Sequence, residues 1–143
     1  MNRRLFLSLC SLLAALASFP AQAETLNVSD AWVRQGPPTA QVLAAYPNLS
    51  RVAVTLRTSR SADRNGWSAV LRSRDGFLAG PSLEIENIVD RVGAGDAFAA
   101  GLIHGLLAFE DVARALAFAV AASALKHTVP GDFNLVTERE VLS

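Results

Sequence analysis

A long, almost wholly apolar run near the C-terminus places the strongest constraint on the fold of this chain. Two acids precede the segment ARALAFAVAASAL, residues 113–125, and Lys126 and His127 follow it. Acids at the start of a helix and basic residues at its end interact favourably with the helix dipole, so this order predicts a helix. A helix that is apolar on nearly every side is usually buried on most sides. It needs a sheet and neighbouring helices to cover it, so the run predicts an α/β domain.

The segments before this helix supply few partners. Leu83–Val89 and two runs, RVAVTLR at 51–57 and WSAVL at 67–71, are typical of strands. Turn signals stand at Asn65-Gly66 and at Gly76. Three or four short strands cover an apolar helix poorly, which indicates a piece of a larger α/β domain. The expected helices are Asp96–Phe109, Glu110–Lys126 and a short last helix that begins at a capping box formed by Thr137 and Glu140.

The first residues have the pattern of an export signal. Arg3 and Arg4 precede the apolar stretch Leu5–Phe19, and Ala21-Gln22-Ala23 is a small-x-small cleavage site. The alternative is a buried or membrane helix, but the apolar stretch is shorter than the roughly 20 residues that a span needs. We therefore predict a signal peptide at residues 1–23 and no membrane span after its cleavage. The only cysteine, Cys10, lies inside it, so the mature chain would have no disulfide or thiolate metal site.

A different kind of sequence follows the expected signal. Residues 24–46 predict one strand, a Gly-Pro-Pro turn and a short strand, and LNVSDAWVR followed by AAY resembles the opening of periplasmic copper chaperones of the PCuAC type. That family is a small β-sandwich that binds copper through methionine and histidine. Met1 is the only methionine, and the two histidines are His104 and His127. Because soft copper sites need such ligands, we predict no copper in this segment.

The stretch VDRVGAGDAFAAG, residues 89–101, carries the candidate chemistry. Gly93-Ala94-Gly95 can turn tightly and aim backbone N–H groups at one point, and a helix start behind them favours an anion. Asp96 in the first helical turn could accept a proton from a hydroxyl. The spacing fits equally well a packing turn with Asp96 as a helix-start acid. A Walker loop is absent because no GK[ST] follows, and the third glycine of a dinucleotide-binding fingerprint would fall at Phe98.

The wider stretch favours phosphoryl transfer. DRVGAGDAFAAGL resembles the C-terminal signature of the PfkB, or ribokinase-like, sugar kinases. Together with FAVAASALKHTVPGDFN, VAVTLRTS and NGWSAV, it is most similar to the 2-keto-3-deoxygluconate kinases. The resemblance covers residues 47–143 and corresponds to the last third of such a kinase. It implies an incomplete ribokinase-like fragment in which short strands are followed by two packed helices.

The resemblance also implies roles for single residues. Asp96 matches the catalytic base, and Gly93, Ala94 and Gly95 match the anion hole. It further implies ATP and Mg²⁺ as cofactors, leaves a monovalent cation open, and implies a nucleotide and a small sugar acid as partners. Two departures are Arg91, where the broader family often has threonine, and Val120, where it often has asparagine. The expected nucleotide-side residues are Thr55, Arg57, Gly66 and Asp90, the last near the monovalent-cation and phosphate region.

Three hypotheses follow from these patterns. The first is a segment of a sugar-acid kinase, inactive alone because the sugar-binding half is absent. The second is an exported copper-chaperone-like module, and the third is a chimera joined near Tyr46. The signal implies the periplasm, whereas a kinase implies the cytoplasm. The formal net charge of zero gives no indication of nucleic-acid binding, and the patterns leave the oligomeric state open.

Overall fold

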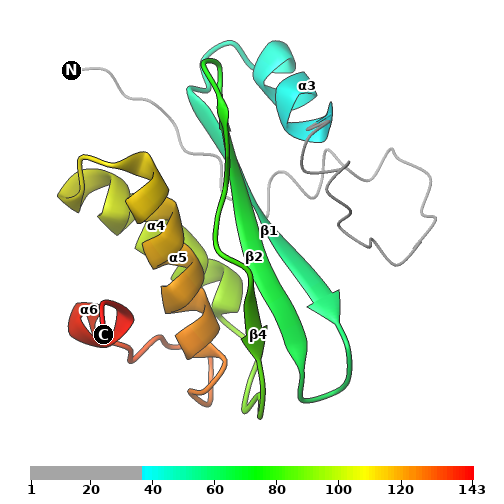
Figure 1. The fold of residues 1–143 in the computed structure, drawn as a ribbon, viewed down its shortest axis with the longest axis vertical. Helices are drawn as coiled ribbons and strands as arrows, with labels where there is room; N and C mark the ends of the chain where they lie inside the picture. The colour runs from blue at the N-terminus through cyan, green and yellow to red at the C-terminus, as the bar shows by residue number, and fades with distance from the viewer. Residues whose placement is uncertain (1–36) are drawn as a thin grey trace.

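The computed structural model describes residues 37–143 (Figure 1). The expected signal peptide and the first part of the copper-chaperone-like segment lie outside the described residues. Within these residues, none of the helices combines the length and hydropathy that crossing a bilayer requires.

A long β-hairpin forms the centre of the sheet. Strand β1 (Arg51–Ser59) and strand β2 (Asn65–Ser73) pair antiparallel along their whole length. Two short strands, β3 (Phe77–Ala79) and β4 (Leu83–Ile85), both pair antiparallel with the other edge of β2. β2 is therefore the central strand, and its alternate residues Trp67, Ala69 and Leu71 belong to the main core.

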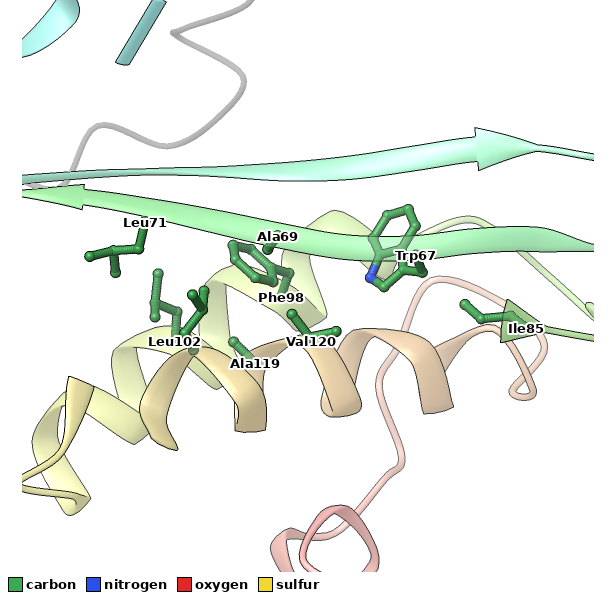
Figure 2. Close-up of a cluster of buried hydrophobic side chains, with 9 residues drawn as sticks. Trp67, Ala69, Leu71, Ile85, Phe98, Leu102, Ala119 and Val120 are labelled. Carbon is green, nitrogen blue, oxygen red and sulfur yellow. The ribbon is translucent and has the colours of Figure 1, made fainter. Parts of the chain in front are cut away.

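Two helices cover one face of this sheet (Figure 1). Helix α4 (Ala94–Ala108) and helix α5 (Val112–Lys126) pack side by side, and the side chain of Asp111 caps α5 by accepting a hydrogen bond from the Ala113 N–H at 2.8 Å. The apolar run of α5 is thus buried as expected. The main core joins β2, β4 and both helices (Figure 2), and consists of Trp67, Ala69, Leu71, Ile85, Phe98, Leu102, Leu116, Ala119 and Val120.

Small residues let α4 and α5 approach closely. A Cβ atom on Gly105 would lie 2.8 Å from the Cα of Ala115, and one on Gly101 would lie 3.1 Å from the Cα of Ala119. Neither site leaves room for a side chain without moving backbone. The two glycines therefore set the spacing of the helix pair.

Residues 37–45 depart from the sequence-based expectation. The structure has a helix, α3 (Pro37–Ala45), where we predicted the rest of a turn and a short strand. Proline is well suited to the first turn of a helix, and the TAQVLAA that follows is rich in good helix formers, so local propensity explains the difference. α3 lies across the sheet from α4 and α5 (Figure 1), where Leu43 packs against Leu49 and Val52.

Two further expectations need correction. The strand predicted for Leu83–Val89 ends at Ile85, and the chain continues through Asn87, whose φ of 55° breaks the extended backbone. Asn65 and Gly66 lie inside β2 rather than in a turn, because the hairpin loop before them closes through hydrogen bonds to the carbonyl of Arg64. The capping box is confirmed, since Thr137 caps α6 (Glu138–Val141) together with Glu140.

The contact of α4 with α5 leads to a first prediction. Gly105→Ala should lower the free energy of unfolding by about 1–3 kcal/mol, because the new methyl overlaps the backbone of α5. Urea unfolding followed by circular dichroism measures this. Gly76→Ala is the matched control, since a Cβ there meets nothing within 4 Å. Equal midpoints for the two variants would contradict the close approach.

Candidate functional site

The glycine-rich loop, residues 89–95, follows the segment after β4 and leads into the start of α4. Gly93 is the N-terminal cap of α4 and has φ 78°, in the left-handed region that favours glycine. A Cβ on Gly93 would lie 2.2 Å from the carbonyl oxygen of Asp132. Gly93 therefore serves the turn and its packing against the loop after α5.

Gly95 and Asp96 face open space at the helix start. A Cβ on Gly95 would meet nothing within 4 Å. In the described part of the chain, the backbone N–H groups of Gly95 and Asp96 have no hydrogen-bond acceptor, and the Asp96 carboxylate, which is exposed, has no partner. The Ala94 N–H is partly engaged, at 3.4 Å from the carbonyl oxygen of Arg91. Free N–H groups at the positive end of a helix dipole are suited to hold an anion next to the carboxylate.

Asp90 connects the glycine-rich loop to the loop after α5. One carboxylate oxygen accepts the Val92 N–H at 3.0 Å, and the other accepts the Gly131 N–H at 2.9 Å. These two hydrogen bonds lower the pKa of Asp90 below its ordinary value, and the bond from Val92 has the larger effect. The carboxylate therefore stays ionised and acts as a brace between two loops.

Ser123 of α5 makes a hydrogen bond to the start of α4. Its hydroxyl is buried and donates to the carbonyl oxygen of Ala94 at 2.7 Å. In a trans peptide the carbonyl and the following N–H point in opposite directions, so this bond orients the Gly95 N–H away from the core. Ser123 is thus a positioning residue for the proposed anion hole.

The last turn of α5 holds the same loop at two more points. The carbonyl oxygen of His127 accepts the Val89 N–H at 2.9 Å and the Asp90 N–H at 3.2 Å. Burial lowers the pKa of His127, which favours the neutral ring whose Nδ1 lies 2.8 Å from the carbonyl oxygen of Ser123. His127 is the C-terminal cap of α5.

The expected nucleotide-side residues of the sheet lie apart from the loop. Thr55 and Arg57 are within β1, paired with Ala69 and Trp67, and do not stand at the end of a strand. Gly66 lies in β2 between β1 and β4, not in a loop. Among the described residues, none of the three makes a hydrogen bond with the glycine-rich loop. Their role in nucleotide binding stays a prediction.

Sequence reasoning missed the residues that organise the loop from α5. Ser123 is one small polar residue in an apolar helix, and Lys126 was interpreted only as a helix-end charge. Lys126 is fully buried, and its ammonium donates to the carbonyl oxygens of Val129 and Gly131. A lone lysine at the end of an apolar helix, four residues before Pro130, was the available signal.

Residues 37–143 contain no group of three or more His, Cys, Asp or Glu side chains that could hold a metal ion.

Comparison with known proteins decides the family. The model of the pfkB family of carbohydrate kinases matches residues 27–138. The chain belongs to the pfkB family. This match starts inside the segment that we compared with copper chaperones and runs through Tyr46, so it lends no support to that resemblance.

Relatives in the pfkB family carry kinase names. The chain is 42% identical over 108 residues to a 2-dehydro-3-deoxygalactonokinase of Haloferax volcanii, a match that covers 69% of this chain and 34% of the relative. It is 31% identical over 120 residues to a 2-dehydro-3-deoxygluconokinase of Bacillus subtilis, covering 82% of this chain and 35% of the relative. The chain thus spans about a third of the length of these relatives.

Solved pfkB structures share the fold. The crystal structure of the 2-dehydro-3-deoxygluconokinase of Thermotoga maritima matches with a TM-score of 0.69 at 40% identity, over 80% of this chain and 33% of that one. A pfkB family kinase of Listeria grayi matches with a TM-score of 0.69 at 31% identity, over 90% and 37%. The prediction of a ribokinase-like α/β fold is confirmed.

The contact between Ser123 and Ala94 leads to a second prediction. Ser123→Ala should cost about 1 kcal/mol of unfolding free energy, because it removes a buried hydrogen bond. Chemical denaturation measures this, with Ser82→Ala as the control at an exposed position. If the Ser123 variant is as stable as the control, the hydroxyl does not support the start of α4.

Proposed function

We propose that this chain is the phosphate-side segment of an ATP-dependent sugar-acid kinase of the 2-keto-3-deoxygluconate type. The observation that carries the proposal is the start of α4, where the free N–H groups of Gly95 and Asp96 adjoin the free carboxylate of Asp96. Membership of the pfkB family supports it, as do the kinase names of the relatives. Because the chain spans about a third of those relatives, activity and substrate belong to the proposal.

The arrangement supplies the two functions that phosphoryl transfer asks of a protein. Transfer of a phosphoryl group needs position and charge stabilisation, with little covalent work by the protein. The Gly93–Gly95 turn and the positive end of the α4 dipole would hold the negative charge that develops on the transferred group. Asp96 would accept the proton of the attacking sugar hydroxyl.

ATP and Mg²⁺ are the cofactors that the family implies. The open space over Gly95 fits a phosphate, because no side chain occupies it and no Cβ keeps the backbone at a distance. Mg²⁺ would neutralise phosphate charge and enter with the nucleotide, and we assign it no protein ligand. The sugar hydroxyl that becomes phosphorylated is the one placed next to Asp96.

The role of Asp96 gives a third prediction. Asp96→Asn should leave ATP binding intact, because the backbone N–H groups remain, and should lower ATP-dependent phosphorylation of 2-keto-3-deoxygluconate about 100-fold or more, because the base is lost. Calorimetry measures ATP binding, and ADP release measures turnover. Asp75→Asn is the matched control, since Asp75 is an exposed carboxylate in the turn between β2 and β3.

The outcomes separate two parts of the proposal. Equal turnover by the Asp96 variant and the control would remove the catalytic role of Asp96. Failure of the unmodified chain to bind ATP would remove the nucleotide role. Binding of ATP without turnover would retain the phosphate site and contradict catalysis by this chain alone.

A further inference from the structure

The ammonium group of Lys126 lies in a cradle of backbone oxygens in the loop after α5. Nζ donates to the carbonyl oxygen of Val129 at 3.0 Å and to that of Gly131 at 2.6 Å. Lys126 is 0% exposed. Taking an ammonium out of water is costly unless polar partners replace the water. The fold retains this charge at the end of a mostly apolar helix, which indicates that the cation serves the loop.

The cradle connects directly to the proposed phosphate site. Gly131, whose carbonyl binds the ammonium, also donates its N–H to Asp90, and Asp90 accepts the N–H of Val92 in the glycine-rich loop. The positive charge of Lys126 is among the influences that lower the pKa of Asp90, after the hydrogen bonds from Val92 and Gly131. Lysine, carbonyls, carboxylate and loop thus form one continuous chain of contacts.

Carbonyl oxygens that converge on one point are the ligands that proteins offer to monovalent cations. Here the carbonyls of Val129 and Gly131 already converge on a covalently attached cation, and Lys126 is an ammonium, a compact point charge. A free monovalent ion at the same point would meet the ammonium at contact distance and be repelled by it. The residues of this cradle therefore do not fit a bound monovalent ion.

We propose that Lys126 is a built-in substitute for a monovalent cation, so that the glycine-rich loop is organised without potassium, sodium or ammonium from solution. The proposal rests on the proposed function in one respect only, namely that the glycine-rich loop binds a phosphate. The cradle itself is independent of that assignment. Lys126 acts as a positioning residue through Gly131 and Asp90, and it does not touch the substrate.

The fourth prediction compares cations at constant ionic strength. The thermal midpoint of the full chain should be the same, within its error, in potassium, sodium, ammonium and choline chloride. Its affinity for ATP should agree within twofold across the same four salts. Lys126→Ala should lower the midpoint, and should lower the affinity for ATP at least tenfold in choline. Potassium or ammonium should restore part of both losses, because the emptied cradle then accepts a small cation while choline is too large.

The design separates this inference from the proposed function. The midpoint requires no nucleotide, so it reports on the cradle even if ATP does not bind. Lys126→Met keeps the length of the side chain and fills the cradle with an apolar end, so it should be destabilised and should not respond to potassium. This difference between Ala and Met is a readout that a merely structural role would not produce.

Two results would overturn the inference. One is a potassium-specific rise in the midpoint or in ATP affinity of the unmodified chain, which would show that the site takes an external ion. The other is a Lys126→Ala variant that responds equally to choline and potassium. Should Lys126→Ala fail to fold in every salt, the unmodified chain still decides, because cation independence supports the inference and cation dependence contradicts it.

Discussion

The close packing of α4 against α5 is the constraint on which the rest of the structure depends. Gly101 and Gly105 bring the two helix backbones together, with no room for side chains at the contact. At this spacing the hydroxyl of Ser123 reaches the carbonyl of Ala94, and the end of α5 reaches the loop before α4. The start of α4 is therefore organised by a neighbouring helix. α5 itself contacts both α4 and β2, which accounts for its nearly all-apolar sequence.

Charges of opposite sign are separated across the loop. A buried ammonium lies on the core side, an ionised Asp90 braces the loop, and the N–H groups of Gly95 and Asp96 face outward. Each buried polar group named here has a partner, which limits the movement of the loop. Pre-organised N–H groups of this kind need little rearrangement when negative charge arrives, and this is the main way in which proteins stabilise a transferring phosphoryl group.

Patterns of residues predicted the fold where they were long or chemically distinctive. The two helices, the hairpin strands, the capping box at Thr137 and the family signature around Asp96 followed from periodicity, capping and motif. Local signals failed where tertiary pairing overrode them, as at Asn65-Gly66, which β1 and β4 hold inside β2. The lone Lys126 was a signal that sequence reasoning missed, and its carbonyl partners depend on how the loop after α5 folds back toward the helix end. The Gly-Pro-Pro sequence misled for another reason, since proline starts helices as readily as it forms turns.

The central claim is that the start of α4 is an anion site, and a titration of the ¹⁵N-labelled chain with ATP tests it most directly. Backbone amide chemical shifts should change most at Gly95 and Asp96, with smaller changes at Val92 and Gly131, which the Asp90 brace connects. Amides around the cavity of about 390 Å³ near Arg51 and Phe77 should change little. Saturable shifts centred on that cavity, with Gly95 and Asp96 unaffected, would contradict the account.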